Sequence, residues 1–145
     1  MIGKKVTVKI DRPMGSYHPK HKDIYYPINY GYIEGIMAPD GEEQDAYVLG
    51  VDEAVEEFGG VVIAIIHRYD DVEEKWVVAP ENVSFTVEEI EKQVHFQEQY
   101  FKSEIRMWMV VVAAVFLWMV GLFKGHSLVW RVSLFSLVFP YFDSF

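Results

Sequence analysis

Three acidic residues stand close together in one short stretch of this chain, and their spacing suggests chemistry. Asp40, Glu42 and Asp45 occupy positions i, i+2 and i+5 of the sequence APDGEEQDAYVLG. In extended backbone alternate side chains point the same way, so Asp40 and Glu42 share a face, and a bend would bring Asp45 to the same point. Converging carboxylates repel one another unless a cation lies between them, and Mg²⁺ prefers such oxygen ligands. The alternative, an acidic turn in solvent, stays open.

A second acidic group lies in the sequence RYDDVEEKWVV, between two apolar runs. It contains four acidic residues followed by a lysine: Asp70, Asp71, Glu73, Glu74 and Lys75. One interpretation is an ordinary hairpin tip. The other joins it to the first group as a multi-metal site, because paired metals can clamp both the attacking and the leaving oxygen in phosphoryl transfer to water. Donors to a polyphosphate would then be Tyr30, Tyr32, Lys75 and Lys102.

Composition limits the function classes. The chain has 145 residues, no cysteine and a formal net charge of -9. The absence of cysteine excludes a disulfide framework and a thiolate zinc site. The acidic balance argues against nucleic acid as a partner, because binding to phosphate backbones needs clustered Lys and Arg. One of the few basic clusters is the loop with His18, Lys20, His21 and Lys22, which is either simply solvated or a set of cations facing an anion.

Short strands must position these residues. Alternation or continuous apolar character predicts strands near residues 4–11, 24–33, 45–51, 59–69 and 75–80. Short strands separated by turns, without helices between them, favour a small closed or half-closed β-barrel. The protein is therefore predicted to be mainly β with some α.

One amphipathic helix follows the strands, over residues 84–105. Thr86 and Glu89 have capping-box spacing, and an apolar face recurs at helical intervals. That face contains Val87, Ile90, Val94, Phe101 and Ile105. We expect it to pack on the barrel.

The sequence YYPINYGYI, followed at its distance by APDGEEQDAYVLG, resembles the soluble family I inorganic pyrophosphatases. The resemblance covers about residues 5–105. It implies a five-stranded barrel of the oligonucleotide/oligosaccharide-binding (OB) type, and hydrolysis of pyrophosphate to two phosphates with several Mg²⁺ ions.

The resemblance also implies roles for individual residues. Two sets of metal ligands are expected: Asp40, Glu42 and Asp45, then Asp70 and Glu73. The carboxylate that activates water would be Glu42, with Asp45 and Tyr30 as its catalytic neighbours. Phosphate contacts would come from Tyr30, Lys75, Tyr100 and Lys102, and from Lys20 in place of an earlier family lysine.

The chain departs from the family pattern at several points. Glu42 and Gln44 replace an aspartate and an apolar residue, and the N-terminal part is shorter than the family's. Mg²⁺ tolerates little positional error, with ligands at about 2.0–2.1 Å. Two hypotheses follow: a Mg²⁺-dependent pyrophosphatase, or a degenerate pyrophosphatase-like domain that binds metal, phosphate or a protein partner without catalysis.

The chain changes character near Arg106. Residues 1–106 form the predicted pyrophosphatase-like domain, and residues 107–145 an apolar tail. Residues 107–123 carry no charge and would span about 25 Å as a helix, slightly short of a hydrocarbon core of about 30 Å. Three interpretations of the tail stay open: a membrane anchor, a non-native extension of the reading frame, or a helix that packs on the domain or forms homo-oligomers. No signal peptide is apparent, so we expect a cytoplasmic protein, with membrane association through the tail as the alternative.

Overall fold

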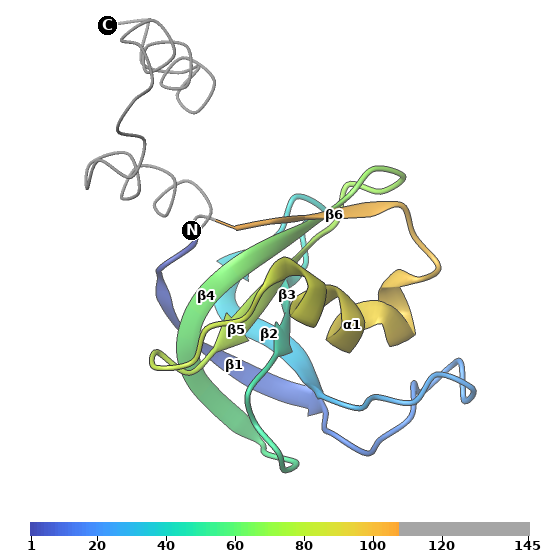
Figure 1. The fold of residues 1–145 in the computed structure, drawn as a ribbon. Coiled ribbons are helices and arrows are strands. Elements are labelled where there is room, and N and C mark those ends of the chain that lie inside the picture. Colours follow the sequence, from blue (N-terminus) through green and yellow to red (C-terminus); the bar gives the residue numbers. More distant parts are fainter. Residues whose placement is uncertain (108–145) are drawn as a thin grey trace, which may run out of the picture. The chain divides into compact units, whose positions relative to one another are not determined.

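Strands dominate the part of the chain that this computed structural model describes, which is residues 1–107 (Figure 1). The elements in chain order are β1 (Lys5–Arg12), β2 (Asn29–Met37), β3 (Glu43–Val48), β4 (Glu57–Arg68), β5 (Glu74–Ala79), α1 (Val87–Glu98) and β6 (Ser103–Arg106). The predictions for the tail, including a membrane segment at residues 107–123, lie outside the described residues. Among residues 1–107, no helix is long and apolar enough to cross a membrane.

Five strands close into a barrel. The sheet order is β1-β2-β3-β5-β4-β6, and an additional pairing between β1 and β4 closes it. β3 and β5 run parallel, and the other pairs are antiparallel. β6 lies outside the closed barrel, paired with the end of β4 (Figure 1). The predicted five-stranded OB-like barrel with an amphipathic helix is confirmed.

The barrel wall buries apolar side chains on both of its faces. Each of the five barrel strands contributes to an interior cluster, made of Val6, Val8, Ile33, Ala46, Val48, Val62, Trp76 and Val78. A second cluster lies between the outside of the barrel and α1, and we call that side the helix-side face. It includes Tyr26, Tyr30, Tyr47, Ala64, Ile66, Val77, Ile90 and Val94. Because alternate strand residues share a face, Asp45 and Lys75 also belong to the helix-side face, two positions before Tyr47 and Val77.

Two register shifts direct basic side chains to that same face. In β1 the pairing with β2 shifts between Ile10 and Arg12, so Ile10 joins the interior cluster while Arg12 lies opposite Tyr30. In β4 the pairing with β5 shifts between Val62 and Ala64. A bulge inserts one extra residue and so reverses the facing of the residues after it. The alternate residues Ala64, Ile66 and Arg68 therefore face α1.

The helix begins as predicted and ends earlier. The Thr86 side chain accepts a hydrogen bond from the Glu89 amide, and the Glu89 side chain accepts one from the Thr86 amide, which completes the capping box. The prediction that the helix continues to residue 105 is wrong, because α1 ends at Glu98. Phe101 follows in a turn, and Ile105 pairs with Ile66 as part of β6.

The Asn-Tyr-Gly-Tyr-Ile segment has structural roles at two of its positions. The buried Asn29 side chain accepts hydrogen bonds from the amides of Met14 and Val55 and donates one to the carbonyl of Glu53. Asn29 thereby holds two connections together. A Cβ at Gly31 would lie 1.8 Å from the Lys9 carbonyl oxygen. Only glycine therefore lets β1 and β2 approach this closely.

Candidate functional site

A buried lysine lies at the centre of the charged groups on the helix-side face. The ammonium group of Lys75, on β5, contacts the carboxylate of Asp45, on β3, and lies 2.8 Å from Oε2 of Glu73. The Lys75 side chain is only 4% exposed, whereas those of Asp45 and Glu73 are 35% and 30% exposed. A buried ammonium group needs such partners to offset its lost hydration. The two partly exposed carboxylates thus supply the partners of the buried ammonium group.

The ring of Tyr30 lies near both this lysine and Arg12. The Lys75 Nζ atom lies 6.0 Å from the ring centre of Tyr30, and the Arg12 guanidinium lies 5.6 Å from the same ring. Arg12 also donates a hydrogen bond of 3.0 Å from Nη1 to the Tyr26 hydroxyl. Burial raises the Tyr30 pKa well above its ordinary value, and the nearby Asp45 carboxylate raises it further. The Tyr30 phenol therefore stays protonated and can act as a hydrogen-bond donor.

A second ion pair anchors the cluster to α1. Arg68 donates from Nη2 and Nε to the carboxylate of Glu98, at 2.6 Å and 3.1 Å, and from Nη1 to Glu73 at 3.0 Å. The Tyr47 hydroxyl donates to Glu98 at 2.7 Å, and the Arg68 guanidinium lies 3.7 Å from the ring centre of Phe101. Sequence reasoning missed Arg68, Glu98 and Tyr47 as members of the site. The available signal was an arginine that directly ends an apolar strand.

Gln44 shows why one departure from the family pattern is tolerated. Its side chain is buried, and its amide nitrogen donates to the carbonyl oxygen of Glu74 at 2.6 Å. This bond joins β3 to the start of β5 just beside Asp45 and Lys75. The polar residue thus stabilises the strand pair that holds the lysine.

The first two residues of the first acidic group lie on an exposed turn. Asp40 and Glu42 are both exposed, and the Asp40 Oδ1 atom accepts a hydrogen bond of 3.0 Å from the Glu42 amide. Gly41 between them has a φ of 89°, in the left-handed region that favours glycine. The Asp40 carboxylate therefore helps to form the turn. Asp70, in the second acidic group, is also exposed and lies in the turn between β4 and β5.

The predicted metal ligands do not form a ready multi-metal site. Among residues 1–107, no three acidic or histidine side chains gather closely enough to hold a metal ion. Two of the five predicted ligands, Asp45 and Glu73, do converge, but they converge on Lys75. Lys75 thus already neutralises two of the carboxylates that Mg²⁺ would need, and the other three lie on exposed turns, so this side-chain arrangement does not fit several Mg²⁺ ions.

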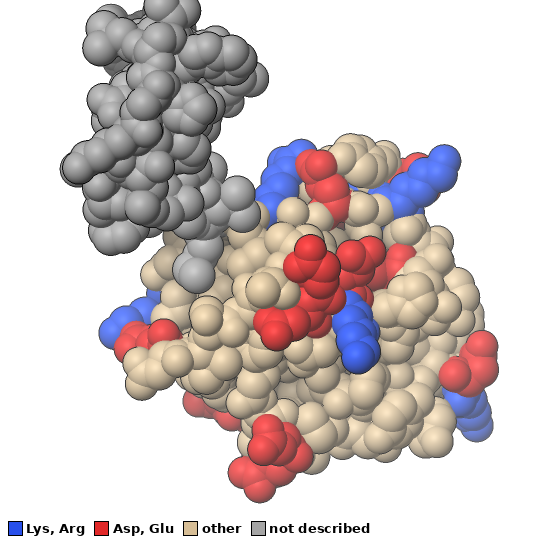
Figure 2. Space-filling model, in the orientation of Figure 1, with Lys and Arg blue, Asp and Glu red and all other residues tan. Residues whose placement is uncertain are grey.

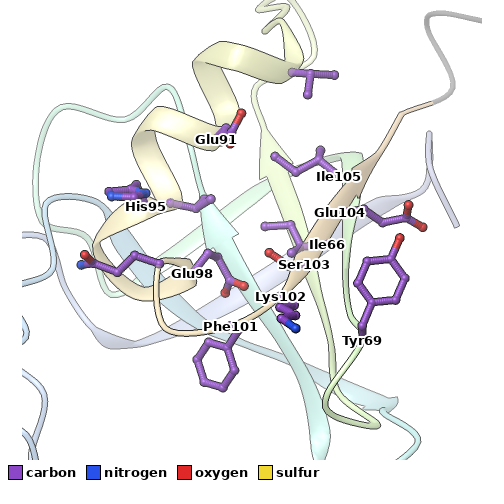
Figure 3. A pocket seen from close by; sticks show the side chains of 13 residues that line it. Ile66, Tyr69, Glu91, His95, Glu98, Phe101, Lys102, Ser103, Glu104 and Ile105 are labelled. Atoms are coloured by element: carbon purple, nitrogen blue, oxygen red, sulfur yellow. The ribbon is translucent and has the colours of Figure 1, made fainter.

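The remaining predicted phosphate contacts are dispersed. Lys20 is exposed in the connection between β1 and β2, and Tyr100 is 62% exposed after the end of α1. Lys102 lines a groove of about 660 Å³ between α1 and β6, together with Tyr69 and Glu104 (Figure 3). Phe101, rather than either neighbour, is the residue of this segment that contacts the charged cluster, through Arg68.

Surface charge on the side of α1 that points away from the barrel is mainly negative. Glu88 and Glu89 lie in the first turn of α1. Figure 2 shows acidic side chains gathered over the middle of the face, where Figure 1 places α1, whereas Lys and Arg are scattered singly.

Solved structures share this fold. The chain is similar to an inorganic pyrophosphatase from Ehrlichia chaffeensis, with a TM-score of 0.58 and 20% identity, over 76% of this chain and 90% of that one. An inorganic pyrophosphatase from Coxiella burnetii matches with a TM-score of 0.51 and 18% identity, over 74% and 89%. The inorganic pyrophosphatase from Helicobacter pylori gives 0.51 and 18%, over 72% and 83%. No family model and no curated protein matches the sequence. The resemblance predicted from the sequence is thus confirmed for the fold.

Proposed function

We propose that this chain hydrolyses inorganic pyrophosphate on the helix-side face of the barrel. The observation that carries the proposal is a cluster around the Tyr30 ring: Lys75 lies near the ring and contacts the partly exposed Asp45 carboxylate, and Arg12 lies near the same ring and donates to the Tyr26 hydroxyl. The proposal is further supported by the fold, which this chain shares with solved inorganic pyrophosphatases.

The side chains suggest a division of roles in that reaction. Lys75 and Arg12 would attract the phosphate oxygens, and the hydroxyl of Tyr30 would donate a hydrogen bond to them. Asp45 would accept the proton of a water that attacks one phosphorus atom. The bond from that phosphorus to the bridging oxygen then breaks, and the bridging oxygen leaves with the second phosphate. Glu42, predicted as the activating carboxylate, would have to move from its exposed turn to take part.

Mg²⁺ dependence belongs to this proposal as an expectation from the resemblance. The predicted ligands are Asp40, Glu42, Asp45, Asp70 and Glu73, and the contacts of Asp45 and Glu73 with Lys75 stand against a preformed site. Inorganic phosphate release, measured with Mg²⁺ and with a chelator, tests the requirement directly.

A specific observation favours a second candidate function, binding of a phosphoanion without hydrolysis. Lys75 and Arg68 already pair with Asp45, Glu73 and Glu98, so these carboxylates need no metal for neutralisation. A domain of this kind would bind pyrophosphate in the presence of chelator and leave it intact.

The deciding experiment measures phosphate release and pyrophosphate binding on the full chain. Asp45→Asn removes the proposed proton acceptor, and Asp52→Asn makes the same change at an exposed loop position as a matched control. Hydrolysis that Asp45→Asn abolishes and Asp52→Asn leaves unchanged supports the enzyme. Binding measured by calorimetry without phosphate release supports the second function, and neither binding nor release refutes both.

A further inference from the structure

The connection between β1 and β2 is organised around one histidine. The Nδ1 atom of His18 accepts hydrogen bonds from the backbone amides of Lys20 and His21, each at 3.0 Å. An imidazole nitrogen accepts hydrogen bonds only when it is unprotonated, so the His18 proton must lie on Nε2 in this arrangement. The backbone amide of His18 donates to the Ile24 carbonyl at 2.9 Å, which fixes the histidine itself.

This histidine lies beside the proposed site. Its ring stacks on that of Tyr26, with ring centres 6.5 Å apart and an angle of 21° between the planes. Tyr26 in turn contacts Tyr30, at 5.6 Å between ring centres, and accepts the hydrogen bond from Arg12. The segment that carries Lys20 therefore lies against Tyr26, which contacts both Arg12 and the Tyr30 ring beside Lys75.

The loop that carries Lys20 could supply positive charge that the site itself lacks. Lys75 pairs with Asp45 and Glu73, and Arg68 pairs with Glu73 and Glu98, so both cations already have carboxylate partners. A pyrophosphate ion carries several negative charges, so its binding needs cations beyond these two. Lys20 and Lys22 are the exposed basic side chains next to His18.

We propose that His18 is a positioning residue, whose unprotonated Nδ1 atom holds the loop that presents Lys20 to the phosphoanion. The proposal rests on the proposed function, because it assigns to the same site a device that orders one of its cations. His18 does not itself touch the reacting atoms in this scheme.

The surroundings of His18 keep Nδ1 available near neutral pH. Burial lowers the His18 pKa from its ordinary value, and the positive charges of Arg12, His21 and Lys20 lower it further, while Asp23 opposes them. The hydroxyl of Tyr26, which packs against the ring, is neutral because burial raises its pKa. Protonation at acid pH would remove both hydrogen bonds to the loop amides.

The test compares His18→Asn with His18→Ala in the full chain. The Oδ1 atom of asparagine can accept the same two amide hydrogen bonds and does not titrate, whereas alanine offers no acceptor. Two readouts are measured: hydrogen exchange of the Lys20 and His21 amides by NMR, and pyrophosphate affinity by calorimetry at pH 7.5. We expect His18→Ala to lose amide protection and to bind roughly three- to tenfold more weakly, as the loss of modest hydrogen bonds implies.

His18→Asn should keep both properties within about twofold, and it should also keep amide protection as the pH is lowered, whereas the unchanged chain loses protection once His18 is protonated. Only amide protection is compared between pH values, because pyrophosphate also changes its protonation with pH and its affinity would change for that reason alone. Unchanged binding by His18→Ala, or equal losses in both variants, would overturn the role of His18. If the unchanged chain binds no pyrophosphate while the amides respond as expected, the proposed function is overturned instead.

Discussion

Replacing Glu98 by glutamine should cost the protein a large share of its stability. Glu98 is 7% exposed and accepts two hydrogen bonds from Arg68, at 2.6 Å and 3.1 Å, and one from Tyr47. Glutamine keeps the shape but removes the charge. Arg68, which is 2% exposed, would then keep only Glu73 as a charged partner.

The magnitude follows from the burial of this pair. Removing one partner of a buried ion pair typically costs about 3–5 kcal/mol. Domains of this size are stable by only about 5–15 kcal/mol. With a denaturant slope of about 1.5 kcal/mol/M, the urea midpoint should fall by about 2–3 M.

Urea denaturation followed by tryptophan fluorescence measures the midpoint. Glu104→Gln is the matched control, because Glu104 pairs with Arg106 at the surface and should leave the midpoint unchanged. The double variant Arg68→Met with Glu98→Gln removes both charges, and should be more stable than the two single losses added together. If Glu98→Gln shifts the midpoint no more than Glu104→Gln, the Arg68–Glu98 pair is not the buried anchor described here.

Three further predictions test the fold. Gly31→Ala should destabilise the protein by at least about 1–3 kcal/mol, because the new Cβ would overlap the Lys9 carbonyl oxygen. Gly59→Ala is the control, because a Cβ there meets no atom within 4 Å. Equal urea midpoints for the two variants would contradict the prediction. Thr86→Ala should cost about 1 kcal/mol through loss of the helix cap, and Thr86→Ser should restore most of it in the same assay. Burial, reinforced by Glu98, raises the Tyr47 pKa well above its ordinary value, so stability should fall as the pH rises above about 10. Tyr47→Phe should make that fall shallower by about 1.4 kcal/mol per pH unit, and an unchanged slope would show that this tyrosine ionises freely.

The five barrel strands could be predicted because each carries a local pattern. β1 alternates apolar and polar residues, and the central part of β4 is apolar on both faces, since it contributes to both the interior and the helix-side clusters. The capping box of α1 could be predicted for the same reason, because its two residues are three positions apart. Local patterns do not show where a helix ends when the residues after it are also apolar. Phe101 and Ile105 continue the helical spacing, but contacts with Arg68 and β4 determine their conformation.

The candidate site could be predicted only in part. Asp45 and Glu73 both contact Lys75, and the Tyr30 ring lies near it, whereas Asp40, Glu42 and Asp70 lie on exposed turns. The pairing of Arg68 with Glu98 joins residues 30 positions apart on different elements, and no sequence spacing indicates it. The facing of Arg68 depends on the bulge in β4, whose extra residue is visible only once the strands are paired.

The long strand β4 also determines the order in which this domain can fold. β4 pairs with β1, β5 and β6 along different parts of its length, and its pairing with β1 joins Lys5 to Val61. Contacts between residues so distant in sequence form slowly, because closing the loop between them costs entropy before the contact adds stability. The hairpin of β1 and β2 can form early during synthesis, but the outer edge of β1 stays unpaired until β4 has left the ribosome. The chain therefore passes through a stage with an open sheet edge, which is when it is most exposed to aggregation.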